Sequence, residues 1–517
     1  MLSSLMKHAV YRKAIAILWV LVLIGLPLTS FPILTRLTGA IVAPFSAIPI
    51  VLLLIIWLVP YLIERGQLPA EIVPLVYFIL IALILSAMAY FLNGTYARGR
   101  DFFHQSLNAF LSLGTGVAFY LIFAAYPSNP KRLRQTFMLI YLSGGLLILW
   151  SLLEVGMLRV YGRVQDLPGW MMAIRSALAV QSPTVMFTNR VTGFAYEPSW
   201  FVRQFNLVLF PIWLSAVYQR ESIFKFRLWK FQVEDFLLGL GLIVFGFSSP
   251  RIGMLAFLGS LAYLSFLLFR RLHRWLTAWF LRRWQGFVRH LTWTKIVLAV
   301  LMVVIIAVLA GSAMIGYVVV ASRWDNRYAL LLQESTLKNL NIFPLTETRL
   351  IYLARNLAFF ERMIYWFGGW HIFNDYPFGV GLGNAGFYFL ERMHGAGYES
   401  LEMRNLIYRA GYLPNTKNMW TRLLAETGFI GLAVFLVWLY LLWRSAGLTR
   451  KSEDKMLRLL GLAGQLFLVA YLFECFSIDS FAMPYQWVMT GLISAGGWYR
   501  RRALLASEKG NDHDLVL

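Results

Sequence analysis

The sequence predicts an all-α integral membrane protein. Of its 517 residues, 59% are hydrophobic and only 14% are charged, while Phe, Trp and Tyr together make up 16%. Apolar runs of membrane-spanning length recur along the chain, and most charged residues lie between them. A soluble globular domain does not combine so few charges with so many aromatic residues. We therefore expect a bundle of transmembrane helices.

Hydropathy divides the chain into about twelve membrane-spanning helices. The first follows Lys7, Arg12 and Lys13 and resembles a signal-peptide core, but no clear small-residue cleavage site comes after it, so we expect this helix to be retained. The predicted spans are 14–28, 40–59, 72–92, 105–126, 135–154, 198–217, 236–247, 252–269, 296–320, 419–443, 459–476 and 485–498.

Basic residues in the short loops predict the orientation of these spans. Cytoplasmic loops carry an excess of Lys and Arg, and here the basic loops fall on the same side as the N-terminus. Both termini are then cytoplasmic, and the segments 155–196, 248–251 and 323–418 lie outside. The basic loop positions are Lys131, Arg132, Arg134, Lys225, Arg227, Lys230, Arg444, Arg450, Lys451, Lys455, Arg500, Arg501 and Arg502.

The spans and the long outer segment give three predicted parts. Residues 1–320 hold the first nine spans, an outer loop at 155–196 and a basic amphipathic segment at 270–294 on the cytoplasmic surface. Residues 321–418 form a large helical loop domain between the ninth and tenth spans. Residues 419–517 hold the last three spans and a short cytoplasmic tail.

The net charge and the positions of the basic residues indicate which kinds of molecule this protein binds. The formal net charge is +22, yet no soluble basic domain or RNA-binding signature accompanies it, so we expect no nucleic acid. The outer segments are rich in Arg, whose guanidinium groups suit phosphate and carboxylate, and this favours an anionic substrate. Alternatively, these arginines form surface ion pairs with outer glutamates. The chain has one cysteine, Cys475, so it forms no internal disulfide.

A carboxylate and a proline mark the entry to the sixth span. Glu197 precedes Pro198, which suits the first turn of a helix, so Glu197 is expected at or beside the N-cap. Arg203 follows about two turns into an apolar run. Burying an arginine there has a high free-energy cost unless the side chain faces a water-filled cavity or an acidic partner. We therefore treat Glu197 and Arg203 as a candidate site.

The tenth span also begins with a polar face. Asn418, Arg422 and Glu426 lie four residues apart and form one stripe, with Lys417 at its outer end. One interpretation is an Arg422–Glu426 ion pair that caps the helix. The other is that the stripe lines the same cavity as Glu197 and Arg203.

The outer loop domain contains two further candidate features. Residues 346–366 read as one amphipathic helix, on which Arg355 and Arg362 lie near one face, two turns apart. A glycine-rich passage follows, and its Gly381-x-Gly383-x-x-Gly386 spacing matches a dinucleotide fingerprint. No strand or βαβ unit surrounds it, so we reject that interpretation. Its backbone N–H groups could instead approach an anion.

Four of these motifs, taken in order, resemble the O-antigen polymerase and O-antigen ligase superfamily. They are Gly193-Phe-Ala-Tyr-Glu-Pro-Ser199; Ser249-Pro-Arg251 at the start of a span; Arg362 with Pro377-x-Gly-x-Gly-x-Gly383; and Lys417-Asn418 followed by Leu-Ala-Glu426-Thr-Gly-x-Ile-Gly. The resemblance spans roughly residues 190 to 432, and the earlier helices agree only in hydropathy.

The resemblance implies a GT-C-like fold in the bacterial inner membrane, with a periplasmic loop over a cavity that opens to the outer leaflet. It implies inverting transfer of a glycan from undecaprenyl diphosphate, without nucleotide sugar, cofactor or essential metal. The implied partners are lipid-linked donor and acceptor glycans and membrane lipids, with a chain-length regulator and a repeat-unit flippase as candidates.

The resemblance and the residues together assign expected roles. Arg203, Arg251 and Arg362 would bind the diphosphate, while Glu197 would act as general base, orient an arginine, or serve only as a charge at a helix start. The expected substrate-binding residues are Lys417, Asn418, Arg355, Gly381, Gly383, Arg422 and Glu426.

Three functions remain open at this point. Ligases that attach O-antigen to lipid A-core typically have a histidine where this chain has Lys417, so the resemblance favours a polymerase over a ligase. A transporter of lipid-linked oligosaccharide would also need many spans and buried charges. The halves show no visible repeat, and the polar motifs gather on the predicted outer face, which disfavours a carrier.

Overall fold

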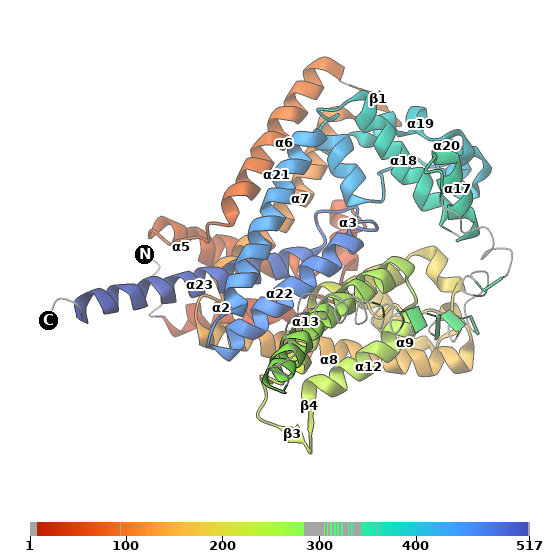
Figure 1. The fold of residues 1–517 in the computed structure, drawn as a ribbon. Helices are drawn as coiled ribbons and strands as arrows, with labels where there is room; N and C mark the ends of the chain where they lie inside the picture. The colour runs from red at the N-terminus through yellow and green to blue at the C-terminus, as the bar shows by residue number, and fades with distance from the viewer. Residues whose placement is uncertain are drawn as a thin grey trace. The chain divides into compact units, whose positions relative to one another are not determined.

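The computed structural model describes residues 8–93, 95–283, 343–357 and 359–514, with isolated positions between 304 and 333. The described residues are almost entirely helical, and their paired strands form two short hairpins (Figure 1). Seven of the described helices are long and apolar enough to cross a membrane: Ile72–Leu92, Phe102–Ala125, Pro130–Tyr161, Pro198–Gln219, Arg251–Trp275, Met419–Arg450 and Lys455–Glu474. The all-α membrane class is thus confirmed.

The chain divides into two compact units, Met1–Gly253 with Tyr365–Leu517, and Met254–Ile364. The N-terminal stretch of the first unit holds α2 Ala9–Ile24, α3 Pro32–Thr38, α4 Ala47–Leu53, the π-helix η1 Leu54–Leu58, α5 Val59–Ile63, α6 Ile72–Asn93, β1 Tyr96–Ala97, β2 Arg100–Asp101, α7 Phe102–Ala125, α8 Pro130–Tyr161, the 3-10 helix η2 Val164–Asp166, α9 Gly169–Leu178 and the 3-10 helix η3 Pro183–Phe187.

The first unit continues with α10 Pro198–Gln204, the π-helix η4 Phe205–Leu209, α11 Phe210–Gln219, β3 Arg227–Leu228, β4 Phe231–Gln232 and α12 Val233–Ser248. Its C-terminal stretch holds α19 Ala385–Arg392, the 3-10 helix η6 Gly395–Glu399, α20 Leu401–Tyr408, α21 Met419–Arg450, α22 Lys455–Glu474 and α23 Pro484–Asp514. Most of α13 Arg251–Arg283, all of α17 Glu347–Asn356 and the start of α18 Phe360–Asp375 belong to the second unit. Each predicted span in the described ranges overlaps a helix, although residues 40–46 of the span 40–59 are not helical. The span 296–320 lies outside those ranges apart from isolated positions.

Aromatic side chains form much of the core of the first unit. α21 packs against α6, α22 and α23, and α23 also packs against α7. Figure 1 shows α21 beside α6. Trp213, Trp438 and Trp487 are fully buried, and the Trp438 and Trp487 rings lie 5.6 Å apart. Buried aromatic rings contribute large apolar areas, so the Trp438–Trp487 contact helps to fix how α21 and α23 pack.

Two predicted segments differ from the structure. The basic stretch after 269 is not a separate surface helix up to residue 283, because α13 continues from Arg251 to Arg283; positions 284–294 lie outside the described residues. The amphipathic helix expected at 346–366 is two helices, α17 and α18.

The break between α17 and α18 has a local geometry that the sequence pattern does not signal. Leu357 leaves the helical conformation at φ −88° and ψ 7°, and the Phe359 N–H bonds to the Ala354 carbonyl at 2.7 Å. The Arg355 guanidinium lies 4.7 Å from the centre of the Phe360 ring. Arg355 and Arg362 are therefore on different helices, and the expectation that they share a helix face is wrong.

Candidate functional site

A short segment between α22 and α23, residues 475–483, receives polar contacts from two predicted site helices. The Arg203 guanidinium on α10 donates to the Ser477 carbonyl and, at 2.9 Å, to its hydroxyl. Arg422 on α21 donates to the Asp479 carbonyl. The Met419 N–H, at the start of α21, bonds to the Cys475 carbonyl at 2.7 Å. The structure thus brings Arg203 and the Asn418–Glu426 stripe to one segment.

Arg203 has a carboxylate partner that the sequence reasoning missed. Its Nε lies 3.6 Å from Oε2 of Glu474, the last residue of α22, and both side chains are almost fully buried. Asn206 donates to Glu474 Oε1 at 2.7 Å and to the Gly253 carbonyl at 2.8 Å. No ion pair joins Arg203 to Glu197 among the described residues. A buried arginine needs such a partner, so Arg203 here holds α10 against the end of α22.

Glu197 occupies the helix start that Pro198 predicts. It is the N-cap residue of α10, with Pro198 in the first turn, and its carbonyl accepts from the Trp200 and Phe201 N–H groups. Its carboxylate is half-buried and does not cap the helix; it accepts a hydrogen bond from the Ser199 hydroxyl. The carboxylate is therefore held in place by Ser199, and it makes no hydrogen bond to the backbone N–H groups of the first turn of α10.

Tyr196 lies next to this carboxylate. Burial, and to a lesser degree the Glu197 charge, raise the pKa of the Tyr196 hydroxyl, while a hydrogen bond with Ser182 lowers it. The Tyr196 ring lies 5.2 Å from the Trp200 ring. The Glu197 carboxylate thus has a protonated phenol as a neighbour, and the ring of that phenol lies against the Trp200 indole.

A fully buried ion pair organises the loop that leads into Glu197. Glu154 on α8 accepts from Arg175 at 2.9 Å, from the Thr192 N–H at 3.1 Å and from the Gly193 N–H at 2.9 Å. Gly193 has φ 55°, which favours glycine. The carboxylate thus holds the loop before α10 against α8, four residues before Glu197. The sequence reasoning missed this role for Glu154, although a charge ending an apolar span was the available signal.

The helix that begins at Arg251 starts against the helix that begins after Glu197. The Ser248 hydroxyl donates to the Pro198 carbonyl at 3.2 Å, and Arg190 donates to the Ser248 carbonyl through Nε at 2.9 Å. Ser249 adopts a left-handed conformation at φ 47°. A Cβ atom at Gly253 would lie 2.4 Å from the Val202 side chain, so this close approach requires glycine. The starts of α10 and α13 are therefore neighbours.

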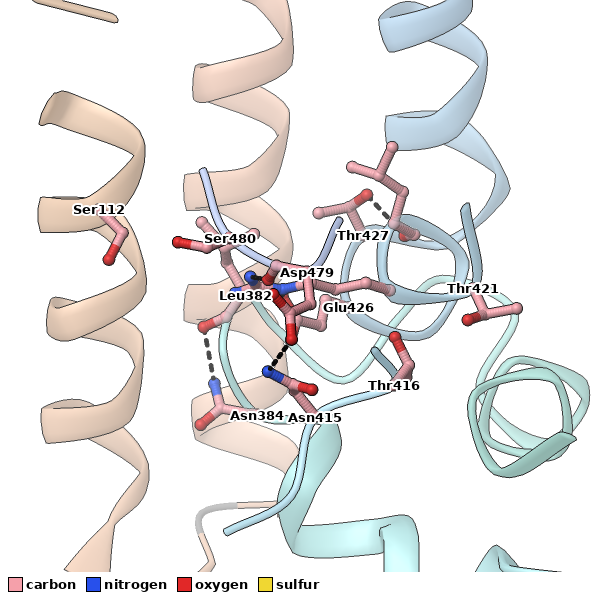
Figure 2. Close-up of polar contacts among 12 residues, drawn as sticks. Ser112, Leu382, Asn384, Asn415, Thr416, Thr421, Glu426, Thr427, Asp479 and Ser480 are labelled. Atoms are coloured by element: carbon pink, nitrogen blue, oxygen red, sulfur yellow. Dashed lines mark hydrogen bonds and ion pairs between the residues drawn. The ribbon is translucent and has the colours of Figure 1, made fainter. Parts of the chain in front are cut away.

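The polar stripe of α21 forms as the spacing predicts. The Asn418 side chain caps the helix by accepting from the Trp420 N–H at 2.8 Å. Arg422 Nε donates to Glu426 Oε2 at 3.0 Å, and both side chains are mostly buried. The expected ion pair therefore forms, but the Asn418 side chain, and not this pair, caps the helix. Figure 2 shows Glu426 close to Asp479, which accepts from Asn415 at 3.2 Å. Asp479 is a third acidic residue, after Glu474 and Glu154, that the sequence reasoning missed.

Lys417, which precedes this stripe in the chain, forms an ion pair with Glu402. Its backbone is left-handed at φ 47°, an uncommon conformation for lysine. Its Nζ lies 2.5 Å from Glu402 Oε1 and 4.2 Å from the centre of the Tyr365 ring. The Tyr365 hydroxyl also donates to Glu402, at 3.1 Å. About a third of the Lys417 side chain remains exposed, so the amine sits at the surface of this cluster.

The glycine-rich passage packs against a break in α21, and the N–H groups of 380–382 bond within the protein. The Val380 and Gly381 N–H groups bond to the Ala425 and Glu426 carbonyls, and the Leu382 N–H bonds to the Ser86 hydroxyl. Gly381 and Gly383 have φ near 87°, and a Cβ at Gly383 would lie 2.7 Å from the Gln105 carbonyl oxygen. The expected anion-binding role of this backbone is therefore wrong for the N–H groups of 380–382.

Gly428 allows this break, and we expect Gly428→Ala to be strongly destabilising. Gly428 has φ 61° and ψ −169° inside α21, and an added Cβ would lie 2.4 Å from the Pro377 carbonyl oxygen. Strain and clash together are expected to cost at least about 1–3 kcal/mol. Gly145→Ala, in α8 with open space around it, is the matched control. Thermal unfolding in detergent measures both; equal midpoints would show that the break is not required.

The remaining predicted site residues belong to the second unit, which is described by itself. Arg355 and Arg362 lie there on α17 and at the start of α18. In the part of the chain that the structure describes, no three His, Cys, Asp or Glu side chains form a metal-ion site. No protein-family model matches the chain, and no curated protein matches it.

Proposed function

We propose that this chain polymerises undecaprenyl-diphosphate-linked oligosaccharide repeat units at the periplasmic face of the bacterial inner membrane. The proposal includes about twelve spans in a GT-C-like arrangement, with both termini cytoplasmic. The product would be O-antigen, capsule or exopolysaccharide. Besides the motif resemblance, one structural observation carries the proposal. The starts of α10, α13 and α21, which hold three of the four motifs, are joined through Asn206, Glu474 and the 475–483 segment.

This arrangement supports a direct transfer between two lipid-linked glycans. The acceptor hydroxyl oxygen forms a bond to the anomeric carbon of the donor while the bond from that carbon to the diphosphate oxygen breaks. The bond electrons leave with the lipid diphosphate, and the hydroxyl proton passes to the Glu197 carboxylate. Inversion at the anomeric carbon follows from this single displacement. The main tasks of the protein are to align the acceptor and stabilise the departing diphosphate.

The residues of the first unit divide into two groups by their contacts. Glu197 is half-buried and accessible to a hydroxyl, and Arg251 stands at the first position of the neighbouring helix, so these two residues are proposed to act on the substrates. Arg203 and Arg422 are buried and donate to carbonyls of the 475–483 segment, so they are proposed to position it. Lys417 is proposed to bind the diphosphate, and its ion pair with Glu402 is proposed to hold the Lys417 amine in position.

A reconstituted reaction tests the proposal. The purified protein in lipid is incubated with undecaprenyl-diphosphate-linked repeat units and no nucleotide, and the products are resolved by length. A ladder of products is expected. Transfer to lipid A-core without a ladder would instead identify a ligase. Movement of the lipid-linked substrate across the bilayer with neither product would identify a transporter and overturn the enzyme proposal.

Arg251→Ala is expected to lower the rate of ladder formation by about 10²- to 10³-fold, because one charged donor to the departing diphosphate is lost. Arg409→Ala is the matched control, since Arg409 is an exposed arginine at the end of α20. It should retain the wild-type rate. Thermal unfolding midpoints establish that both variants fold. Wild-type activity of folded Arg251→Ala would remove Arg251 from the proposed machinery.

A further inference from the structure

The structure has a second charged region, remote in sequence from the motifs, at the start of α8 and on the β3–β4 hairpin. Its members are exposed lysines and arginines, which we call the basic patch: Lys131, Arg134, Lys225, Arg227 and Lys230. Among the described residues, none of these five cations has a carboxylate within ion-pair distance, whereas other surface arginines, such as Arg458 and Arg501, do.

The acidic residues on the adjoining elements are already engaged. Glu234 accepts from the Ser222 hydroxyl, at 2.8 and 3.0 Å, and from the Ile223 N–H. Asp235 accepts from the Gln232 N–H and pairs with Arg220 at 3.5 Å, and Glu221 pairs with Arg458. The local carboxylates therefore do not neutralise the basic patch, which retains an uncompensated positive charge.

A surface depression lies within the patch. It has a volume of about 560 Å³ and is lined by Pro130, Lys131, Arg134, Gln135 and Met138. Arg134 also donates to the Ile223 carbonyl at 3.2 Å, and the Phe224 ring lies 5.4 Å from the Tyr141 ring of α8. These contacts fix the base of the hairpin beside the depression. Two cations of α8, Lys131 and Arg134, thus border the depression, and the base of the hairpin lies next to Arg134.

The hairpin itself presents apolar side chains to its surroundings. Leu228 pairs with Phe231 across the strands, and Phe226 directly precedes β3. Trp229 at the turn is 85% exposed and Phe226 is 65% exposed. Large exposed aromatic side chains beside lysines are typical of a segment at the boundary between lipid headgroups and acyl chains.

We propose that the basic patch and the hairpin form a binding site for the headgroup of an anionic phospholipid. The phosphate would lie in the depression between Lys131 and Arg134, with Lys225, Arg227 and Lys230 adding attraction. The apolar face of the hairpin would enter the same leaflet. A soluble phosphate would neutralise the cations but would leave the aromatic side chains of the hairpin exposed. A lipid would do both, so cations beside exposed aromatic side chains favour a lipid over a soluble phosphate.

A fluorescent probe on the hairpin tests this site without reference to enzymatic activity. Cys475 is fully buried, so a Leu228→Cys variant of the full chain can be labelled with an environment-sensitive fluorophore, with the unmodified chain as labelling control. The labelled protein is placed in nanodiscs of phosphatidylcholine containing a trace of headgroup-quencher lipid, either phosphatidylglycerol or phosphatidylcholine. Quenching should be markedly stronger with the anionic quencher lipid.

Charge removal distinguishes a lipid site from general membrane contact. Neutralising Lys131, Lys225 and Lys230 to Gln should weaken the preference for the anionic quencher by about 10- to 100-fold. The matched control neutralises Arg444, Lys451 and Lys455, three exposed cations on the same predicted side. That control should keep the preference. Equal quenching by both lipids, or no quenching by either, would overturn the proposal. Displacement of the anionic lipid by millimolar glycerol phosphate would show a site for soluble phosphate and would also overturn it.

Discussion

Glu197→Gln is expected to lower the rate of polymer formation by about 10²- to 10⁴-fold if its carboxylate accepts the proton of the acceptor hydroxyl. The change keeps the size of the side chain and removes only its basicity. The start of α10 should persist, because the Glu197 carbonyl, and not its side chain, accepts the N–H bonds of the first turn. Initial rates of ladder formation by the reconstituted protein measure the effect.

Two comparisons separate the possible roles of Glu197. A glutamine can still accept the Ser199 hydrogen bond and orient an arginine, so high activity in Glu197→Gln with low activity in Glu197→Ala would assign an orienting role. Wild-type activity in both would leave Glu197 as no more than a charge at a helix start. Glu391→Gln, at an exposed carboxylate near the end of α19, is the matched control and should remain fully active.

Glu474→Gln is expected to have the largest effect on stability. The change leaves the buried Arg203 guanidinium without its carboxylate, and breaking a buried pair in this way costs about 3–5 kcal/mol. The loss is expected to loosen the 475–483 segment, because Arg203 holds Ser477 through both its carbonyl and its hydroxyl. Unfolding of the purified protein by increasing fractions of sodium dodecyl sulfate, followed by circular dichroism, measures the free energy of unfolding.

Removing both charges provides the internal check on that pair. Arg203→Met with Glu474→Leu should be less destabilising than the sum of the two single changes, because no uncompensated charge stays buried. Glu453→Gln, at an exposed position in the turn before α22, should lie within about 0.5 kcal/mol of wild type. Strict additivity in the double variant would show that Arg203 and Glu474 do not interact. The double variant should fold yet polymerise poorly if Arg203 positions the site.

The sequence predicted helix starts and helix pairs well where the residues that decide them lie within one or two turns of each other. Pro198 placed the start of α10, hydropathy placed the start of the tenth span at 419, where α21 begins, and the four-residue spacing placed Arg422 beside Glu426. The break at Gly428 was not predicted, since a single glycine in an apolar run gives no sign that a distant carbonyl needs the space. The break after α17 was missed for a similar reason, because neither glycine nor proline occurs at Leu357–Phe359.

The candidate site was only partly predictable. Glu197, Arg203 and the α21 stripe were found because charges near apolar runs are conspicuous, but their partners were not. Glu474 lies 271 residues after Arg203 in the chain, and Arg175 lies 21 residues after Glu154. Each acidic partner lies at the end of an apolar run, where burying its charge is energetically costly, so each could have been predicted to need a partner. Nothing in the sequence shows which arginine neutralises which carboxylate.

By itself the sequence determined the membrane class, the positions of most helices and the start of each polar motif. These follow from apolar length, capping and spacing, which act over one or a few helical turns. Only the tertiary structure decided that Arg203 pairs with Glu474, that the glycine-rich N–H groups bond within the protein, and that α21 breaks at Gly428. These outcomes depend on which buried charges and carbonyls meet, and that is set by packing between helices far apart in the chain.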